Sequence, residues 1–347
     1  MKSSRISRCY WFFSALLLIA ALASLMIGPL AFGPWQSIQT LTAIVFPFFE
    51  GVSATHIIVM ESLRLPRTLL CILIGANLAV CGAMMQGLFR NALADPAIVG
   101  VSSGAALGAA LAIYTSHILF SGLPSLGQEI YIAGAAFIGG IAVTLLVLRI
   151  ATTRLGTSVS VMLLAGIAIT ALSGSGIAML YYFADDTVLR NIVAWQLGSL
   201  VGANWIMVSL AAFVCLLLLV SIRNTAAPLN ALLLGESEAR YLGVNVQRLK
   251  YMLICLTALA VGVSVACVGL IGFVGLVVPH LVRLLVGPDH RAVLPLSALL
   301  GACLLLTADL IARTALMPIE LPVGVIMGII GAPFFIYLLL KQRNHMV

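Results

Sequence analysis

The class of structure is decided by residues 65–88, which have the sequence LPRTLLCILIGANLAVCGAMMQGL. Arg67 is the one charged residue in this stretch. A membrane-spanning α-helix needs about 20 consecutive apolar residues, so the stretch is long enough to cross a bilayer. Asn77 and Gln86 lie inside it, and strongly polar groups at that depth are costly unless they face protein or water. The stretch predicts a transmembrane helix that contributes these two side chains to a translocation path.

Similar apolar runs recur along the whole chain. Hydrophobic residues make up 62% of the 347 positions and charged residues only 8%, against roughly 25% charged in an ordinary soluble domain. The pattern predicts an all-α polytopic membrane protein of about ten transmembrane helices, forming a single transmembrane domain over 1–347. Gly269, Gly272 and Gly275 mark the break between the seventh and eighth runs. The predicted spans are 10–32, 65–88, 97–115, 130–150, 159–183, 205–222, 251–268, 270–286, 293–312 and 322–340.

The basic residues predict the topology. With both termini in the cytoplasm and the chain alternating, 14 of the 18 Lys and Arg residues fall inside, as the positive-inside rule requires. Arg64, Arg67, Arg190 and Arg313 remain outside. We therefore expect a multi-pass protein of the bacterial inner membrane. Ala21-Leu22-Ala23 resembles a cleavage site, so a removed signal peptide is the alternative for the first run, but the apolar run continues to Ala31 and favours a retained span.

Two outer segments and two groups of glycines carry further expectations. Residues 33–62 are expected to form a long outer loop, and 189–200 a short helix at the outer surface. Gly100, Gly104 and Gly108 recur at every fourth position, as do Gly324 and Gly328. This spacing lets helix backbones approach closely within lipid.

Enzyme and nucleic-acid functions find little support. The chain has no Gly-Lys pair, hence no Walker A nucleotide site, and no HExxH motif. The basic residues form no stripe interleaved with aromatic residues, which argues against nucleic acid. No two of the seven cysteines are spaced as CxxC and most lie inside apolar runs, so buried, inert thiols are expected rather than a metal site or a disulfide framework. Residues 100–104 match GxSxG; an intramembrane protease using Ser102 or Ser103 would need His280 as its base.

The segment 228–248 lies in the largest predicted cytoplasmic loop. Within it, Gly235 and Gly243 bracket about two helical turns of mixed charged and apolar residues. A solvated turn between spans is one interpretation. The other is a short helix that docks into a groove of a partner, which a transporter without its own nucleotide site would need. The candidate coupling residues are Gly235, Glu236, Ser237, Glu238, Ala239, Arg240, Tyr241, Leu242 and Gly243.

A series of short motifs runs along the chain after the first span. They are RLPR at 64–67, GAMMQG at 82–87, NALADP at 91–96 with Gly100, WQLGSL at 195–200, LGE at 234–236 through LG at 242–243, GFVGLVVPH at 272–280, ADLIAR at 308–313 and ELPVG at 320–324. With these motifs in this order, the sequence resembles the FecCD family of ABC importer permeases, which handle cobalamin, ferric siderophores and haem.

The resemblance implies the ten-helix type II importer fold, a homodimer with a central path, and partners on both sides. The partners are two ATP-binding subunits that hold the ATP and a periplasmic binding protein, with no permanently bound cofactor. Residues 236–242 would be the coupling helix. Arg64, Arg67 and Arg313 would contact carboxylates of the binding protein, although headgroup contacts are the alternative and Arg67 is a candidate for half-burial.

The substrate and the path are predicted more loosely. The stretch Tyr181-Tyr182-Phe183-Ala184-Asp185-Asp186 is most similar to the haem permeases of the family, with ferric siderophore and then cobalamin as alternatives. Asp309 and Arg313 are four residues apart and can pair on one helix face; a part in transport is the other possibility for Asp309. His280 joins Asn77, Gln86 and Asp309 as a candidate lining the path.

Overall fold

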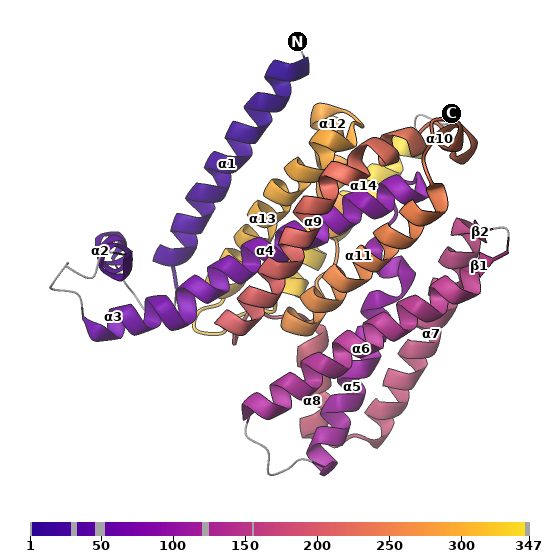
Figure 1. Ribbon diagram of the computed structural model, residues 1–347. Helices are drawn as coiled ribbons and strands as arrows, with labels where there is room; N and C mark the ends of the chain where they lie inside the picture. The colour runs from indigo at the N-terminus through magenta and orange to yellow at the C-terminus, as the bar shows by residue number, and fades with distance from the viewer. Residues whose placement is uncertain (1, 29–32, 46–52, 120–124, 155, 344–347) are drawn as a thin grey trace.

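The computed structural model describes residues 2–28, 33–45, 53–119, 125–154 and 156–343. Helices dominate it, and the described strands form one short hairpin (Figure 1). The α-helices are α1 Lys2–Met26, α2 Pro34–Val45, α3 Ala54–Val59, α4 Leu65–Phe89, α5 Val101–Leu119, α6 Ser125–Ala151, α7 Val159–Phe183, α8 Asp186–Gln196, α9 Trp205–Leu232, α10 Glu236–Tyr241, α11 Val246–Val268, α12 Val274–Val286, α13 His290–Thr314 and α14 Val323–Arg343. A π-helical turn Met60–Arg64, a 3₁₀ turn Pro96–Val99 and the strands β1 Thr152–Thr153 and β2 Gly156–Thr157 complete the order.

Each predicted span coincides with one α-helix. Among the described residues, seven helices are long and apolar enough to cross a membrane, and α5, α12 and α14 are shorter apolar helices. Two of the predicted C-terminal ends differ by six residues or more. Helix α1 ends at Met26, and residues 29–32 of its predicted span lie outside the described part of the chain; α9 continues ten residues past 222 to Leu232. The polar residues Arg223 and Asn224 end the hydrophobic run of α9 but leave its backbone hydrogen bonding unaffected.

Helix α4 forms the centre of the bundle and packs against α9, α11, α12 and α13. Two of its glycines lie almost on neighbouring backbones. A Cβ added to Gly75 would lie 2.4 Å from the carbonyl oxygen of Gly301 on α13, and one added to Gly82 would lie 1.9 Å from that of Gly275 on α12. Both distances are shorter than any van der Waals contact, so only glycine fits at these crossings.

The glycines expected to allow close packing do so at most of the predicted positions. A Cβ at Gly104 or Gly108 would meet a carbonyl oxygen of α6 within 2.4 Å, and one at Gly324 would lie 2.3 Å from the oxygen of Leu197. Gly100 lies between the 3₁₀ turn and α5 with a φ of +87°, which glycine adopts without strain. Gly328 has open space where a Cβ would be, so no close contact accounts for it.

The segments predicted to lie outside are more helical than expected. Residues 33–62 were predicted as a loop, of which 46–52 lie outside the described residues. Helices α2 and α3 occupy much of the remainder, and α3 continues through the π-helical turn into α4. The predicted short helix at 189–200 is present as α8, three residues earlier at its start and four at its end. Val188 and Ile192 bury one face of α8, and it packs on α5.

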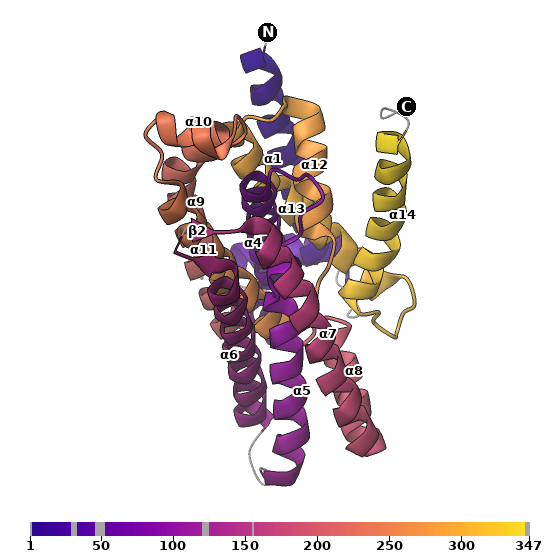
Figure 2. The same ribbon diagram turned by 90° about the vertical axis from the view of Figure 1, so that its right-hand side faces the viewer.

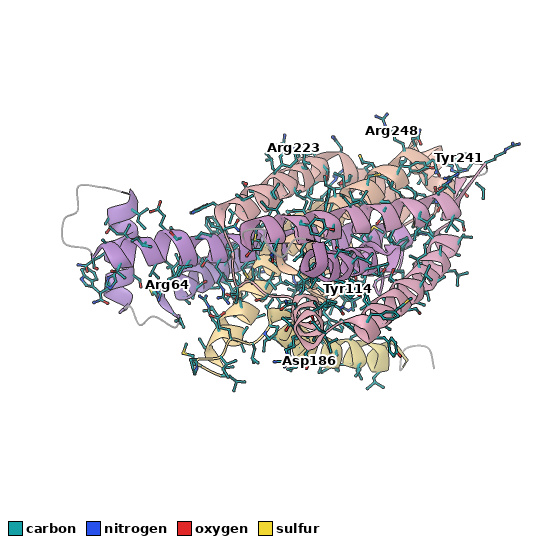
Figure 3. All side chains as sticks on the ribbon, turned by 90° about the horizontal axis from the view of Figure 1, so that it is seen from below. Arg64, Tyr114, Asp186, Arg223, Tyr241 and Arg248 are labelled. Carbon is teal, nitrogen blue, oxygen red and sulfur yellow. The ribbon has the colours of Figure 1, made fainter. Side chains whose placement is uncertain are left out.

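One end of the molecule gathers α10, the β1–β2 hairpin, the start of α1 and the last described turn of α14. Figures 1 and 2 show these elements at the same end of the bundle. Figure 3 places Tyr241 and Arg248 together at one edge, with Arg64 on the far side. The cysteines are free, as expected. They are not uniformly buried, because Cys255 is exposed on the surface of α11.

Candidate functional site

A cluster of charged side chains joins α4 and α13 at the end opposite α10. The Arg67 guanidinium donates to both oxygens of Asp309, with Nη2 2.8 Å from Oδ1 and Nε 3.2 Å from Oδ2. Its Nη1 lies 2.8 Å from Glu320 Oε2. The predicted pairing of Asp309 with Arg313 is confirmed, with Arg313 Nε 3.5 Å from Oδ2. Asp309 therefore balances two guanidinium groups while being 1% exposed.

Two of the three predicted docking arginines are buried rather than exposed. Arg64 is 5% exposed and donates through Nη1 to the carbonyl oxygens of Leu25 (2.6 Å) and Met26 (3.2 Å) at the end of α1. Arg313 is 3% exposed and donates to Ser24 Oγ at 2.6 Å. The exposure assumed from the sequence was wrong for this pair, because an arginine at a helix end satisfies its donors on neighbouring carbonyl and hydroxyl oxygens. Arg67 is half-buried, as anticipated.

The same arginines nevertheless share a cavity. A hollow of about 240 Å³ is lined by the residues that follow α1, start α4 and end α13, together with the turn before α9. Arg64, Arg67 and Arg313 contribute the positive charge of its wall and Glu320 a negative charge. All three guanidinium groups also donate hydrogen bonds within the chain, Arg67 to Asp309 and Glu320, Arg64 to the end of α1 and Arg313 to Ser24.

The other polar candidates are distributed through the bundle. Asn77 is fully buried and donates to the carbonyl oxygen of Ala211 on α9 at 3.2 Å. Gln86 donates to the carbonyl oxygens of α12 at Gly275 and Leu276, and its own oxygen accepts from Arg283. These groups fasten α4 to α9 and α12. Asp309 is instead bonded to Arg67, so the path candidates Asn77, Gln86 and Asp309 each have different partners and are not brought together at one site.

His280 differs from those three because it retains exposed surface. Its ring meets that of Phe334 on α14 edge to face, with centroids 6.4 Å apart. The residue thus lies where α12 faces α14, and those two helices pack together.

Helix α10 has one buried and one exposed side. Ala239 is fully buried against the bundle, while Tyr241 is 92% exposed and Leu234 and Leu242 are also exposed. Gly235 at the N-cap has a φ of +135° and Gly243 beyond the end has +84°, so the bracketing glycines supply backbone conformations that other residues adopt only with strain. The predicted short helix is confirmed, and it presents an aromatic and aliphatic surface at the water-facing end.

A buried lysine beneath α10 was missed by sequence reasoning. Lys250 is 4% exposed, and its Nζ lies 2.7 Å from Glu236 Oε1. From the sequence, Lys250 was counted only as one of the basic residues predicted to lie on the cytoplasmic side. A signal was present, because Lys250 is four residues after Val246 and three before Leu253 and therefore shares the apolar face of α11. Both of those residues are buried.

Comparison with known proteins identifies the chain. The model of the FecCD transport family matches residues 16–341, nearly the whole sequence. The chain belongs to the FecCD transport family. The hemin transport system permease protein HmuU of Yersinia pestis is 46% identical over 288 residues, covering 82% of this chain and 84% of the relative. The vitamin B12 import system permease protein BtuC of Vibrio cholerae is 41% identical over 344 residues, covering 99% of this chain and 96% of the relative.

A solved structure carries the same fold as this FecCD protein. It is an inward-facing conformation of a metal-chelate type ABC transporter, with a TM-score of 0.80 and 32% identity, covering 95% of this chain and 98% of the other. The family membership and this likeness confirm the expected fold and make the chain a multi-pass membrane permease of the ABC importer type.

The protease alternative finds no support in this FecCD permease. Ser103 Oγ donates to the carbonyl oxygen of Gly100 at 3.1 Å and accepts from Thr170 at 3.2 Å. The residues around it are helical, whereas a nucleophile elbow joins a strand to a helix. The His280 ring meets that of Phe334 on α14.

Proposed function

We propose that this FecCD permease imports haem or a closely related metal chelate as part of an ABC importer. The observation that carries the proposal is the 46% identity with a hemin transport permease. The outer end of α7 supports it, because Tyr182 and Phe183 are 84% and 60% exposed and their rings meet edge to face at 5.2 Å. Exposed aromatic faces suit a planar, largely apolar macrocycle.

Cobalamin is the second candidate, favoured by the vitamin B12 permease that matches 99% of the chain; a ferric siderophore is the third. The deciding experiment measures ATP hydrolysis by the complete importer in liposomes, with its cognate binding protein loaded in turn with hemin, cyanocobalamin or a ferric siderophore. Hemin should stimulate hydrolysis most. Stimulation by cyanocobalamin alone would replace the haem proposal with the cobalamin one.

The working assembly that we propose is a homodimer with two ATP-binding subunits and a periplasmic binding protein. Segment 228–248 is the coupling segment, with α10 at its centre. The exposure of Tyr241, Leu242 and Leu234 supports this role. When a partner protein covers apolar side chains that face water, the free energy of the complex falls. ATP binding and hydrolysis belong to the partner subunit.

A single substitution tests the contact. Tyr241→Asp places a charge in the centre of the exposed surface and should greatly reduce the amount of ATPase subunit that purifies with the permease. Arg223→Ala is the matched control, since Arg223 is exposed on α9 outside the α10 surface. Equal recovery of the ATPase subunit with Tyr241→Asp and with the wild type would refute the assignment.

On the opposite face, we propose that the arginine-lined cavity receives an acidic side chain of the binding protein. Arg64, Arg67 and Arg313 line that cavity. Arg64→Gln should weaken the binding protein's affinity and reduce its salt dependence, because it removes one of the positive charges from the cavity wall. Affinity and salt dependence equal to those of the wild type would leave Arg64 with its helix-fastening role alone.

We further propose that both termini are cytoplasmic, in a bacterial inner membrane. The described ends of α1 and α14 lie at the α10 end of the bundle (Figure 2), which is consistent with an even number of spans. For the translocation path, His280 is the best placed of the four candidates, because Asn77, Gln86 and Asp309 are buried within the chain.

A further inference from the structure

Lys250 touches two elements that no backbone connects directly. Its ammonium lies 2.7 Å from Glu236 Oε1 at the start of α10 and donates a 2.9 Å hydrogen bond to the carbonyl oxygen of Thr157 in β2. The lysine itself stands in the first turns of α11. One side chain therefore bridges α10 and the β1–β2 hairpin, which lie at the same end of the molecule (Figure 1).

The hairpin is held to α11 by more than this bond. Gln247 accepts from the Thr157 N–H at 3.1 Å and donates through Nε2 to Thr157 Oγ1 at 2.6 Å. With Lys250 on its carbonyl oxygen, Thr157 has its N–H, C=O and hydroxyl all bonded to α11. The next residue, Ser158, is the N-cap of α7 and accepts from the Val161 N–H. Whatever moves Thr157 therefore moves the start of α7.

Because the Lys250 ammonium is buried, it needs the ion pair with Glu236 of α10. The Lys250 side chain is 5% exposed, and a buried ammonium is strongly destabilising without a counter-charge. Glu236 is the carboxylate that supplies it in the described structure. Arg240 competes only weakly for that carboxylate, since its Nη2 is 4.0 Å away and its side chain is 64% exposed. A displacement of α10 must therefore carry Lys250 along or leave a buried charge unpaired.

We infer that Lys250 is a positioning residue that transmits displacement of α10 to the β1–β2 hairpin and so to α7. The inference rests on the proposed contact between α10 and the ATPase subunit. Helix α7 is suited to respond, because much of its surface, including Ile167, Leu172 and Tyr182, is not packed within the chain. The side chain acts through Glu236 and Thr157 and has no contact with substrate in this role.

The test measures coupling rather than abundance. Lys250→Met keeps most of the aliphatic stem and removes the charge. The complete importer is reconstituted in liposomes with its binding protein, and hemin delivered per ATP hydrolysed is compared with wild type. The ratio should fall at least fivefold while the ATPase subunit copurifies in the normal amount. The control is Arg223→Met, which also removes a positive charge but at an exposed position on α9 outside segment 228–248, and it should leave the ratio unchanged.

A double-mutant comparison separates the relay from general damage. Glu236→Gln removes the counter-charge with little change in shape and should lower the ratio similarly. The double variant should be no worse than the poorer single variant, because both substitutions break one link. A normal ratio in Lys250→Met, or losses that multiply in the double variant, would overturn the inference. Should Lys250→Met fail to reach the membrane, a normal ratio in Glu236→Gln overturns it equally.

The outcome at Tyr241 keeps this inference distinct from the proposed function. If Tyr241→Asp retains the ATPase subunit, the docking assignment of α10 is wrong and the inference falls with it. If Tyr241→Asp loses the ATPase subunit while Lys250→Met couples normally, α10 docks as proposed and the relay alone is wrong.

Discussion

Replacing Asp309 by Asn should destabilise this permease more than any other single change of charge in the cluster that it forms with Arg67, Arg313 and Glu320. Asp309 is 1% exposed and accepts three hydrogen bonds from Arg67, with Arg313 beside it at 3.5 Å. The amide has nearly the same shape, so packing is retained. What is lost is the negative charge between two guanidinium groups, which then face each other across a neutral side chain.

The size of the effect follows from the burial of the pair. Breaking a buried ion pair by removing one partner costs about 3–5 kcal/mol, because the remaining charge is left without compensation. Glu320 offsets part of this loss, since it stays 2.8 Å from Arg67, but it is more exposed than Asp309 and is screened by water. At about 2 °C per kcal/mol for a chain of this length, the full loss would lower the unfolding midpoint by about 6–10 °C, and the part offset by Glu320 places the expected fall toward the lower end of that range.

The buried cysteines supply the assay. Cys71, Cys81 and Cys303 are buried in the fold, so a maleimide dye that fluoresces on reaction reports their exposure as detergent-solubilised protein is heated. Glu320→Gln is the matched control and should shift the midpoint by no more than about 2 °C, because it removes a partly exposed partner worth roughly 0–1 kcal/mol.

The double variant Arg67→Met, Asp309→Leu tests the reasoning itself. If the cost is the uncompensated charge, removing both partners should recover at least half of the stability lost in Asp309→Asn. A midpoint for Asp309→Asn within 2 °C of wild type would refute the view that Asp309 is needed to balance the arginines. A double variant less stable than the single one would refute the charge explanation and point to shape instead.

Three further predictions address the crossing of α4, the topology and the α12–α13 turn. Gly82→Val should abolish accumulation in the membrane, because its Cβ would lie 1.9 Å from a carbonyl oxygen, whereas Gly134→Ala, with open space around it, should accumulate normally on immunoblots. Reporter fusions after Val347 and within 230–245 should both report the cytoplasm, and a periplasmic signal from either would contradict the ten-span topology. Partial desolvation, which acts to raise the pKa of Asp289, is outweighed by the Arg291 N–H, the Asn230 amide and the Arg291 charge, so its pKa is lowered. The ionised Asp289 carboxylate therefore stabilises the fold fully above the unfolded-state pKa of about 3.9, and this stabilisation is lost as the pH falls through the lower pKa of the folded state. In thermal melts at different pH values, Asp289→Asn should reduce the decrease of the melting temperature at acid pH.

The apolar runs predict the spans well because lipid selects for composition over some twenty residues, and a continuous window captures that requirement. The same windows misplace the ends of α1 and α9, where a helix leaves the apolar region or stops within it. Arg223 interrupts the hydrophobic run of α9, yet the helix continues to Leu232. Hydropathy describes the solvent around a helix, whereas backbone hydrogen bonds and capping decide where it ends.

Long-range partners explain what was missed in the site. The pairing of Asp309 with Arg313 is local in the helix and could be predicted from a spacing of four. The bond from Arg67 to Asp309 joins residues 242 apart, and that to Glu320 joins residues 253 apart. No spacing rule predicts such contacts, so arginines that seemed exposed from their place in the topology are in fact largely enclosed.

The two crossings of α4 also restrict how this sequence can change length. Gly75 and Gly82 are seven residues apart, about two helical turns, so both lie on the same side of the helix. Deleting or inserting one residue between them would rotate one crossing by about 100° relative to the other. A larger side chain would then face a carbonyl oxygen beside which only glycine, with no Cβ atom, can fit. Divergent descendants of this sequence should therefore gain and lose residues in the connecting segments, while the interval from Gly75 to Gly82 stays constant.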